Sequence, residues 1–131
     1  MAYENLTKVL SWPAVADLSA FQFYPVTLIT SSTFPEGCIT TIGATATKPL
    51  GILQDAPDAA GVMGSVCIAG VSKCAIYTGA VAVLDAIGVN TSSQGAVTTT
   101  DNQWTVGVSL EKAADTNTVP LLTIDVNVAR Y

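Results

Sequence analysis

The clearest pattern in the chain is a strict alternation of apolar and polar residues in two segments of its second half. The first segment carries its apolar side chains at Trp104, Val106, Val108 and Leu110, and the second carries them at Leu122, Ile124, Val126 and Val128. A period of two is typical of a strand with one buried face and one face in water. The pattern predicts two strands that bury Val106, Val108, Ile124 and Val126 and turn outward Thr105, Ser109, Thr123 and Asp125.

Shorter apolar runs between turn residues predict further strands. These runs cover residues 26–30, 38–42, 49–54, 80–84 and 95–100. Residues 65–77 fit either a pair of strands or one bent strand, with Gly70 at the bend. Short strands at close spacing indicate a mainly β fold, namely a small single-domain β-barrel or β-sandwich with little helix.

The first sixteen residues differ from the rest of the chain. They show weak helical character between Glu4 and Leu10, and Pro13 favours an extended backbone at the preceding tryptophan. We therefore divide the chain into an extended N-terminal arm, residues 1–16, and a β-domain, residues 17–131. The arm is expected to dock on a neighbouring molecule, with a frayed terminus as the alternative. Its candidate contact residues are Val9, Leu10, Trp12 and Pro13.

Composition limits the function classes. Half of the residues are hydrophobic and 11% are charged, against about 25% charged in typical domains. A chain with so few charges and so many apolar residues is expected to bury apolar surface in an oligomer or a larger assembly. The net charge of −5 with only five cations argues against nucleic-acid binding and against binding to anionic membranes. The apolar stretch at 79–89 is interrupted by Asp85 and is too short to span a bilayer. The first residues do not resemble a signal peptide, so synthesis in a cytoplasm is expected.

Catalytic chemistry finds little support in the sequence. The chain has no histidine, which removes the commonest general base, the commonest metal ligand and every histidine-based triad. Asp55 and Asp58 fit a turn better than a calcium site, which needs more oxygen ligands. The cysteines are odd in number, namely Cys38, Cys67 and Cys74. They lack the spacing of a metal site and are expected to be small buried apolar residues. We expect no catalytic, metal-binding or cofactor-binding residues, no cofactor and no enzyme activity.

Five segments, in order along the chain, carry a family resemblance. They are ADLSAFQFYPVTL (16–28), KPLGILQDAP (48–57), GSVCIAGVSK (64–73), VGVSLEKA (106–113) and LLTIDVNV (121–128). Together they resemble the capsid cement, or decoration, proteins of tailed bacteriophages, which are small head-stabilising proteins.

The resemblance implies a β-tulip-like β-domain that sits on the outer surface of an assembled phage head and stabilises it. It implies that the protein is made in the bacterial host cytoplasm, binds the major capsid protein and forms a homo-oligomer. A trimer is favoured and a dimer is the runner-up. The alternative is a small carbohydrate- or receptor-binding module on a virion or cell surface. That alternative requires aromatic side chains grouped on a solvent-exposed face. The aromatic residues of the strand segments are instead expected to lie in the core, namely Phe21, Phe23, Tyr24, Tyr77 and Trp104.

Overall fold

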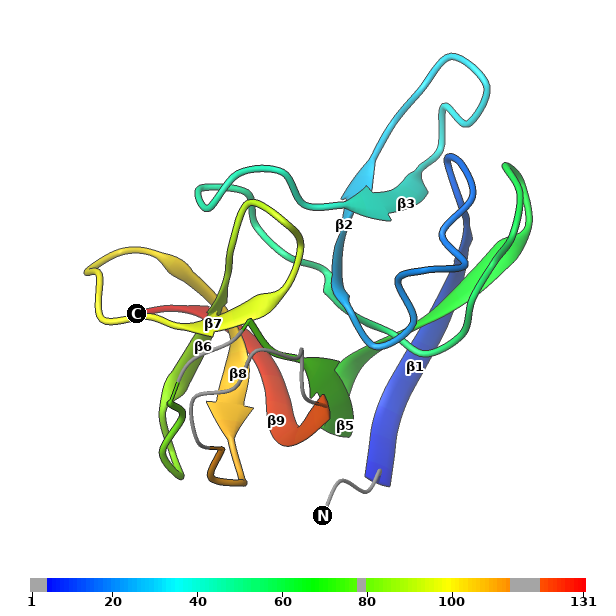
Figure 1. The fold of residues 1–131 in the computed structure, drawn as a ribbon. Helices are drawn as coiled ribbons and strands as arrows, with labels where there is room; N and C mark the ends of the chain where they lie inside the picture. The colour runs from blue at the N-terminus through cyan, green and yellow to red at the C-terminus, as the bar shows by residue number, and fades with distance from the viewer. Residues whose placement is uncertain (1–4, 78–79, 114–120) are drawn as a thin grey trace.

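The computed structural model describes residues 5–77, 80–113 and 121–131, which form an all-β fold with no helix among them. The strands are β1 (Asn5–Pro13), β2 (Pro25–Ile29), β3 (Cys38–Thr41), β4 (Gly51–Leu53), β5 (Met63–Ala75), β6 (Ala86–Val89), β7 (Gly95–Val97), β8 (Trp104–Ser109) and β9 (Leu121–Arg130). They form one curled antiparallel sheet (Figure 1). The prediction of a small, mainly β fold is confirmed.

Strand β5 is the centre of the sheet. The strand order is β3-β2-β4-β5-β9-β8-β6-β7, and β1 also pairs with β5. Cys67 of β5 has Val9 of β1 and Ile52 of β4 as partners, while Gly70 has partners in both β1 and β9. Because a strand has only two edges, β4 and β9 follow one another along one edge of β5, and β1 occupies the other. Figure 1 shows β1 running beside the long β5.

Two hydrophobic cores lie on opposite faces of this central region. The large core contains Ile42, Ile52, Cys67, Cys74, Ile76, Val81, Ile87, Val89, Val106, Leu122, Ile124 and Val126. The small core contains Ala14, Leu18, Val26, Ile39, Leu53 and Val66. Neighbouring residues of a strand point to opposite faces, and here Ile52 and Cys67 enter the large core while Leu53 and Val66 enter the small one. Strands β4 and β5 are therefore buried on both sides.

The observed strands correct several expectations. The weak helical character between Glu4 and Leu10 was a wrong indication, because residues from Asn5 onward form β1 and take their backbone partners from β5. The stretch at 80–84 is also no strand. Leu84 there has a φ of 70° in a turn, and the strand follows it as β6. Of the two interpretations of residues 65–77, the structure has the single bent strand, with Gly70 at a φ of 114°. The division into arm and β-domain stays a prediction.

The pairing of β8 with β9 decides which residues of β8 face the core. From Thr105 opposite Ala129 to Gly107 opposite Val126, β8 advances by two residues and β9 by three, so β9 carries a β-bulge with one extra residue. Beyond the bulge, Val108 pairs with Asp125 and Ser109 pairs with Ile124. Val106, Ile124 and Val126 are buried as predicted, but Val108 lies opposite the exposed Asp125 and is only partly buried.

Three of the four residues expected to face outward are buried. Ser109 lies beyond the bulge, opposite the core residue Ile124. Thr123 is fully buried under Glu111, to which its hydroxyl donates a 3.0 Å hydrogen bond. Thr105 is 7% exposed and donates to the carbonyl of Ala129. The outward assignment holds for Asp125 alone.

The buried Ser93 links the β2–β3 end of the sheet to the β6–β7 hairpin. It lies in the loop between β6 and β7, at a φ of 62°. Its hydroxyl donates to the carbonyl oxygen of Pro25 at 2.6 Å and accepts from the amide of Ile42 at 2.9 Å. One side chain therefore satisfies backbone groups at the start of β2 and after β3, and fixes both to the β6–β7 hairpin.

We predict that Gly107→Ala destabilises the protein by about 1–3 kcal/mol, the usual cost of overpacking. A Cβ at this position would overlap the carbonyl oxygen of Asp125 on β9, which is backbone and cannot move aside. Gly43→Ala is the matched control, because nothing lies within 4 Å of its Cβ position. Urea unfolding of both variants measures the difference. Equal stability of the two variants would contradict the observed approach of β8 and β9.

We also predict that Ser93→Ala lowers the free energy of unfolding by about 1–3 kcal/mol, because two buried backbone groups lose their partner. Ser92→Ala is the control, since the Ser92 side chain is exposed and only its amide is hydrogen-bonded. Thermal melts compare the two variants. Equal melting temperatures of the Ser93→Ala and Ser92→Ala variants would show that the Ser93 hydroxyl does not hold β2 and β3 to the β6–β7 hairpin.

Candidate functional site

Titratable groups do not converge in the described part of the chain. No three histidine, cysteine, aspartate or glutamate side chains there lie close enough to share a metal ion. Asp55 has a structural role, since its carboxylate accepts a 3.0 Å hydrogen bond from the amide of Ser65. The described residues also include no helix long and apolar enough to cross a membrane. Two hollows in the surface of the described residues are candidate binding sites.

The predicted contact residues of the arm all lie on β1. Val9 and Leu10 are 38% and 43% exposed, while Trp12 and Pro13 are partly buried. Trp12 packs against the small core. We call these four residues the β1 surface. Along the strand, Val9 and Pro13 point to one face of the sheet, and Leu10 and Trp12 point to the other. The structure thus places them together on one strand, but in a sheet rather than on a detached arm.

An open hollow of about 470 Å³ borders the β1 surface. Trp12 and Pro13 form one side, and the loop at 33–37 forms the other side with Phe34 and Pro35. The adjoining Met63 lies opposite Pro13 in the β1–β5 pair and is 55% exposed. The result is a surface of mainly apolar and ring side chains, which is typical of the anchoring parts of protein interfaces.

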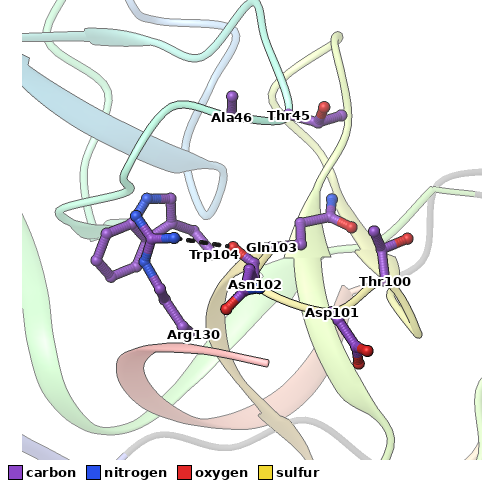
Figure 2. Close-up of a pocket in the computed structure, with 8 residues that line it drawn as sticks. All are labelled: Thr45, Ala46, Thr100, Asp101, Asn102, Gln103, Trp104 and Arg130. Carbon is purple, nitrogen blue, oxygen red and sulfur yellow. Dashed lines mark hydrogen bonds between the residues drawn. The ribbon is translucent and has the colours of Figure 1, made fainter.

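A second open hollow, of about 510 Å³, lies beside Trp104 at the start of β8 (Figure 2). The residues that line it are mostly of polar type and come from three separate segments, namely Thr45, Ala46, Thr100, Asp101, Asn102, Gln103, Trp104 and Arg130. Figure 2 shows Thr45 and Ala46, from the loop between β3 and β4, facing the turn at 100–103 across the hollow. Sequence reasoning missed this site.

Two cations contact the indole ring of Trp104. The guanidinium carbon of Arg130 lies 4.5 Å from the ring centroid, and the Nζ of Lys48 lies 5.0 Å from it. Trp104 and Arg130 are direct partners in the β8–β9 pair, so their side chains share a face of the sheet. Lys48 is positioned from β2, where the hydroxyl of Thr27 donates to its carbonyl oxygen at 2.8 Å. A cation over an indole ring is attracted by the negative face of the ring.

The turn at 100–103 is held by its own backbone. The amide of Gln103 donates to the carbonyl of Thr100, and Asn102 adopts a φ of 63°, which asparagine tolerates well. Asn102 and Gln103 also exchange backbone hydrogen bonds with Tyr131, after β9. The Asn102 carbonyl accepts a further hydrogen bond from Arg130 Nη1 at 3.3 Å (Figure 2). The side chains at the hollow are thus carried by a fixed backbone.

The aromatic residues did not all follow the expectation that they are core. Tyr77 is 54% exposed and Trp104 is partly buried, and both lie outside the two cores. Phe21 and Phe23 do pack against a core. The only signal in the sequence for the second hollow was the polar run directly before Trp104.

The three cysteines are free and buried, as expected. Burial raises the pKa of the Cys74 thiol from its usual 9.0 to about 12, while a hydrogen bond from the backbone of Gly95 acts in the opposite direction. A thiol that stays protonated is a poor nucleophile and a poor metal ligand. Cys74 therefore serves as a packing residue of the large core.

Comparison with solved structures reveals a similar fold in a phage head protein. The chain superposes on the crystal structure of the head fiber gp8.5 N base of bacteriophage phi29 with a TM-score of 0.66. The likeness covers 92% of this chain and 95% of that chain, at 16% sequence identity. No protein-family model matches the sequence. No curated protein matches it either.

At this identity the likeness shows a shared fold alone. The shared fold spans β1 as well as the later strands, because almost the whole of each chain is covered. Residues with a proposed role therefore have to be judged on their geometry in this chain.

We predict that Cys74 makes stability fall at alkaline pH. Above pH 9.0 the thiol of the unfolded chain loses its proton, while the folded chain keeps it until about pH 12. The unfolded state then binds fewer protons, so the free energy of unfolding decreases as pH rises through this window. Melting temperatures of wild type and Cys74→Ala across the window isolate the effect. Parallel curves for the two proteins would contradict the prediction.

Proposed function

We propose that this protein is a structural component of a phage virion, which binds the outer surface of the assembled head and stabilises it. The observation that carries the proposal is the fold likeness to a phage head fiber base over nearly the full length of both chains. The ordered segments that resemble cement proteins support the same conclusion independently. A fold alone does not determine function, so the proposal also depends on a surface suited to docking.

The β1 surface is the proposed contact with the major capsid protein. Its apolar residues, together with Met63, leave side chains in water that a protein partner would cover. Trp12 and Phe34 border the adjoining hollow, and aromatic side chains in such positions contribute most to interface affinity. Because β1 is hydrogen-bonded to β5 along its length, this surface is already ordered before docking. Docking therefore does not require the ordering of a free arm, which would reduce the affinity.

Stabilisation follows from binding linkage. A protein that binds the assembled shell, and not its dissociated subunits, shifts the equilibrium towards the shell. A homo-oligomer, with the trimer favoured, would engage several shell subunits at once and gain avidity from their high effective concentration. No catalytic step is required for this role.

We predict that the protein is present in purified virions in many copies, and that Val9→Thr weakens its binding to heads several-fold. The substitution places a hydroxyl on the β1 surface while keeping the side-chain shape. Val97→Thr is the matched control, because Val97 on β7 is 39% exposed, against 38% for Val9. Co-sedimentation with heads that lack the protein measures both affinities.

Trp12→Ala should reduce binding further, by about 2 kcal/mol if Trp12 is an anchor. Since Trp12 also packs against the small core, the melting temperature of the Trp12→Ala variant must be measured in parallel. Absence of the protein from virions would refute the proposal. Equal binding of the Val9→Thr and Val97→Thr variants would refute the assignment of the β1 surface.

A further inference from the structure

The hollow beside Trp104 contains groups that are not used by the fold. Among the described residues, the side chains of Thr45, Thr100, Asp101 and Asn102 make no hydrogen bond, although all four line the hollow. Each is exposed and supplies hydroxyl, amide or carboxylate groups. By contrast, Gln103 is held in place, since its side-chain oxygen accepts a hydrogen bond from the hydroxyl of Thr98. The hollow therefore combines a fixed frame with free polar groups.

The charge at this site differs from the charge of the whole chain. Lys48 and Arg130 are two of only five cations in a chain of net charge −5, and both lie against one ring. Within the described residues, neither forms an ion pair with a carboxylate. Two positive charges at one ring, neither of them paired with a carboxylate, favour an anionic ligand beside that ring. Arg130 also has a planar guanidinium that matches a carboxylate geometrically.

We infer that this hollow is a binding site for an acidic saccharide, a sugar chain that carries carboxylate groups. The carboxylate would be bound by Arg130, which lines the hollow, and the sugar hydroxyls by Thr45, Thr100 and Asn102. Lys48 would add positive charge from its place over the indole ring. The volume of about 510 Å³ lies within the range of small-molecule sites. This inference is independent of the proposed docking to a phage head, because it involves other strands and requires only the free protein.

Other ligand classes fit the lining less well. An apolar ligand would find only Ala46 and the covered indole of Trp104 as apolar partners. Single-stranded nucleic acid would require a series of cations along its phosphates, whereas the described residues place only Arg130 and Lys48 at the Trp104 ring, which suffices for a single carboxylate. The sugar hydroxyls are what distinguish the proposed ligand from a simple anion.

The test uses an oligosaccharide of galacturonic acid and its methyl ester, which keeps the hydroxyls and removes the charge. Titration is followed by the indole N–H signals in a nitrogen-correlated NMR spectrum. The chain has two tryptophans, and Trp12→Phe assigns the remaining signal to Trp104. We expect the acidic oligosaccharide to shift the Trp104 signal and the ester to bind roughly tenfold more weakly, as the loss of a charge-assisted contact requires.

Variants locate the site. Arg130→Met should weaken binding roughly tenfold, because it removes the charge-assisted contact to the carboxylate. Lys48→Met should weaken binding less, since Lys48 acts from outside the lining of the hollow. Both residues are exposed, so neither substitution removes a buried side chain. Lys112→Met is the matched control, because it removes one exposed positive charge beyond the other end of β8 and should leave the affinity unchanged. Asp101→Asn should tighten binding about threefold, since it removes an exposed negative charge near the ligand.

Three results would overturn the inference. The first is no shift of the Trp104 signal with the acidic oligosaccharide. The second is equal binding of the ester. The third is equally tight binding of polyphosphate or of a single-stranded oligonucleotide, which would identify an unspecific anion site. Failure of the protein to bind phage heads would leave this inference unaffected, because the saccharide titration does not involve heads.

Discussion

The whole structure depends on strand β5, which is buried on both faces at Val66 and Cys67 and has partner strands along both edges. Strand β5 places Val66 in the small core and Cys67 in the large core, so each of these adjacent side chains is surrounded by protein. Its edges are occupied by β1 on one side and by β4 and β9 on the other. Strands of this kind are almost continuously apolar, because neither face is in water. The sequence of β5 has this character, with Lys73 as its only charged residue.

Close approach of backbones is the second condition of the fold. Gly51 lies against the carbonyl of Cys67 and Gly107 lies against the carbonyl of Asp125, in both cases without room for a Cβ. The second contact coincides with the bulge in β9, where the twist of a strand increases. The end of β8 that carries Trp104 is thereby positioned opposite Arg130. Packing within the sheet thus determines the geometry of a surface hollow.

The sequence predicted the elements better than the faces. The period of two located β8 and β9 to within about two residues, because one buried face leaves a local signature. It assigned Val108 to the core, since a bulge has no local signature in an alternating segment. Strand β1 was missed because its partner lies some sixty residues away, from Met63 onward, and long-range pairing can override weak helix propensity.

The candidate sites divide in the same way. The four residues of the β1 surface were named from the sequence because apolar residues next to a proline are visible there, and their role as contacts stays a prediction. The hollow at Trp104 was not, since it requires the β8–β9 register, the β3–β4 loop and the turn at 100–103 to be known together. Trp104 was consistent with a core position in the alternating pattern, and only its partner Arg130 identifies the ring as a surface contact.

The two cores also impose an order on folding during synthesis. All residues of the small core, from Ala14 to Val66, have left the ribosome before any residue of β9 is translated. The large core must wait for Leu122 to Val126. The residues of the small core are thus available to one another while β5 still lacks its partner β9. Apolar side chains of β5 that await β9 are a site of aggregation and of chaperone binding, so the rate at which residues 76–126 are translated sets how long they wait.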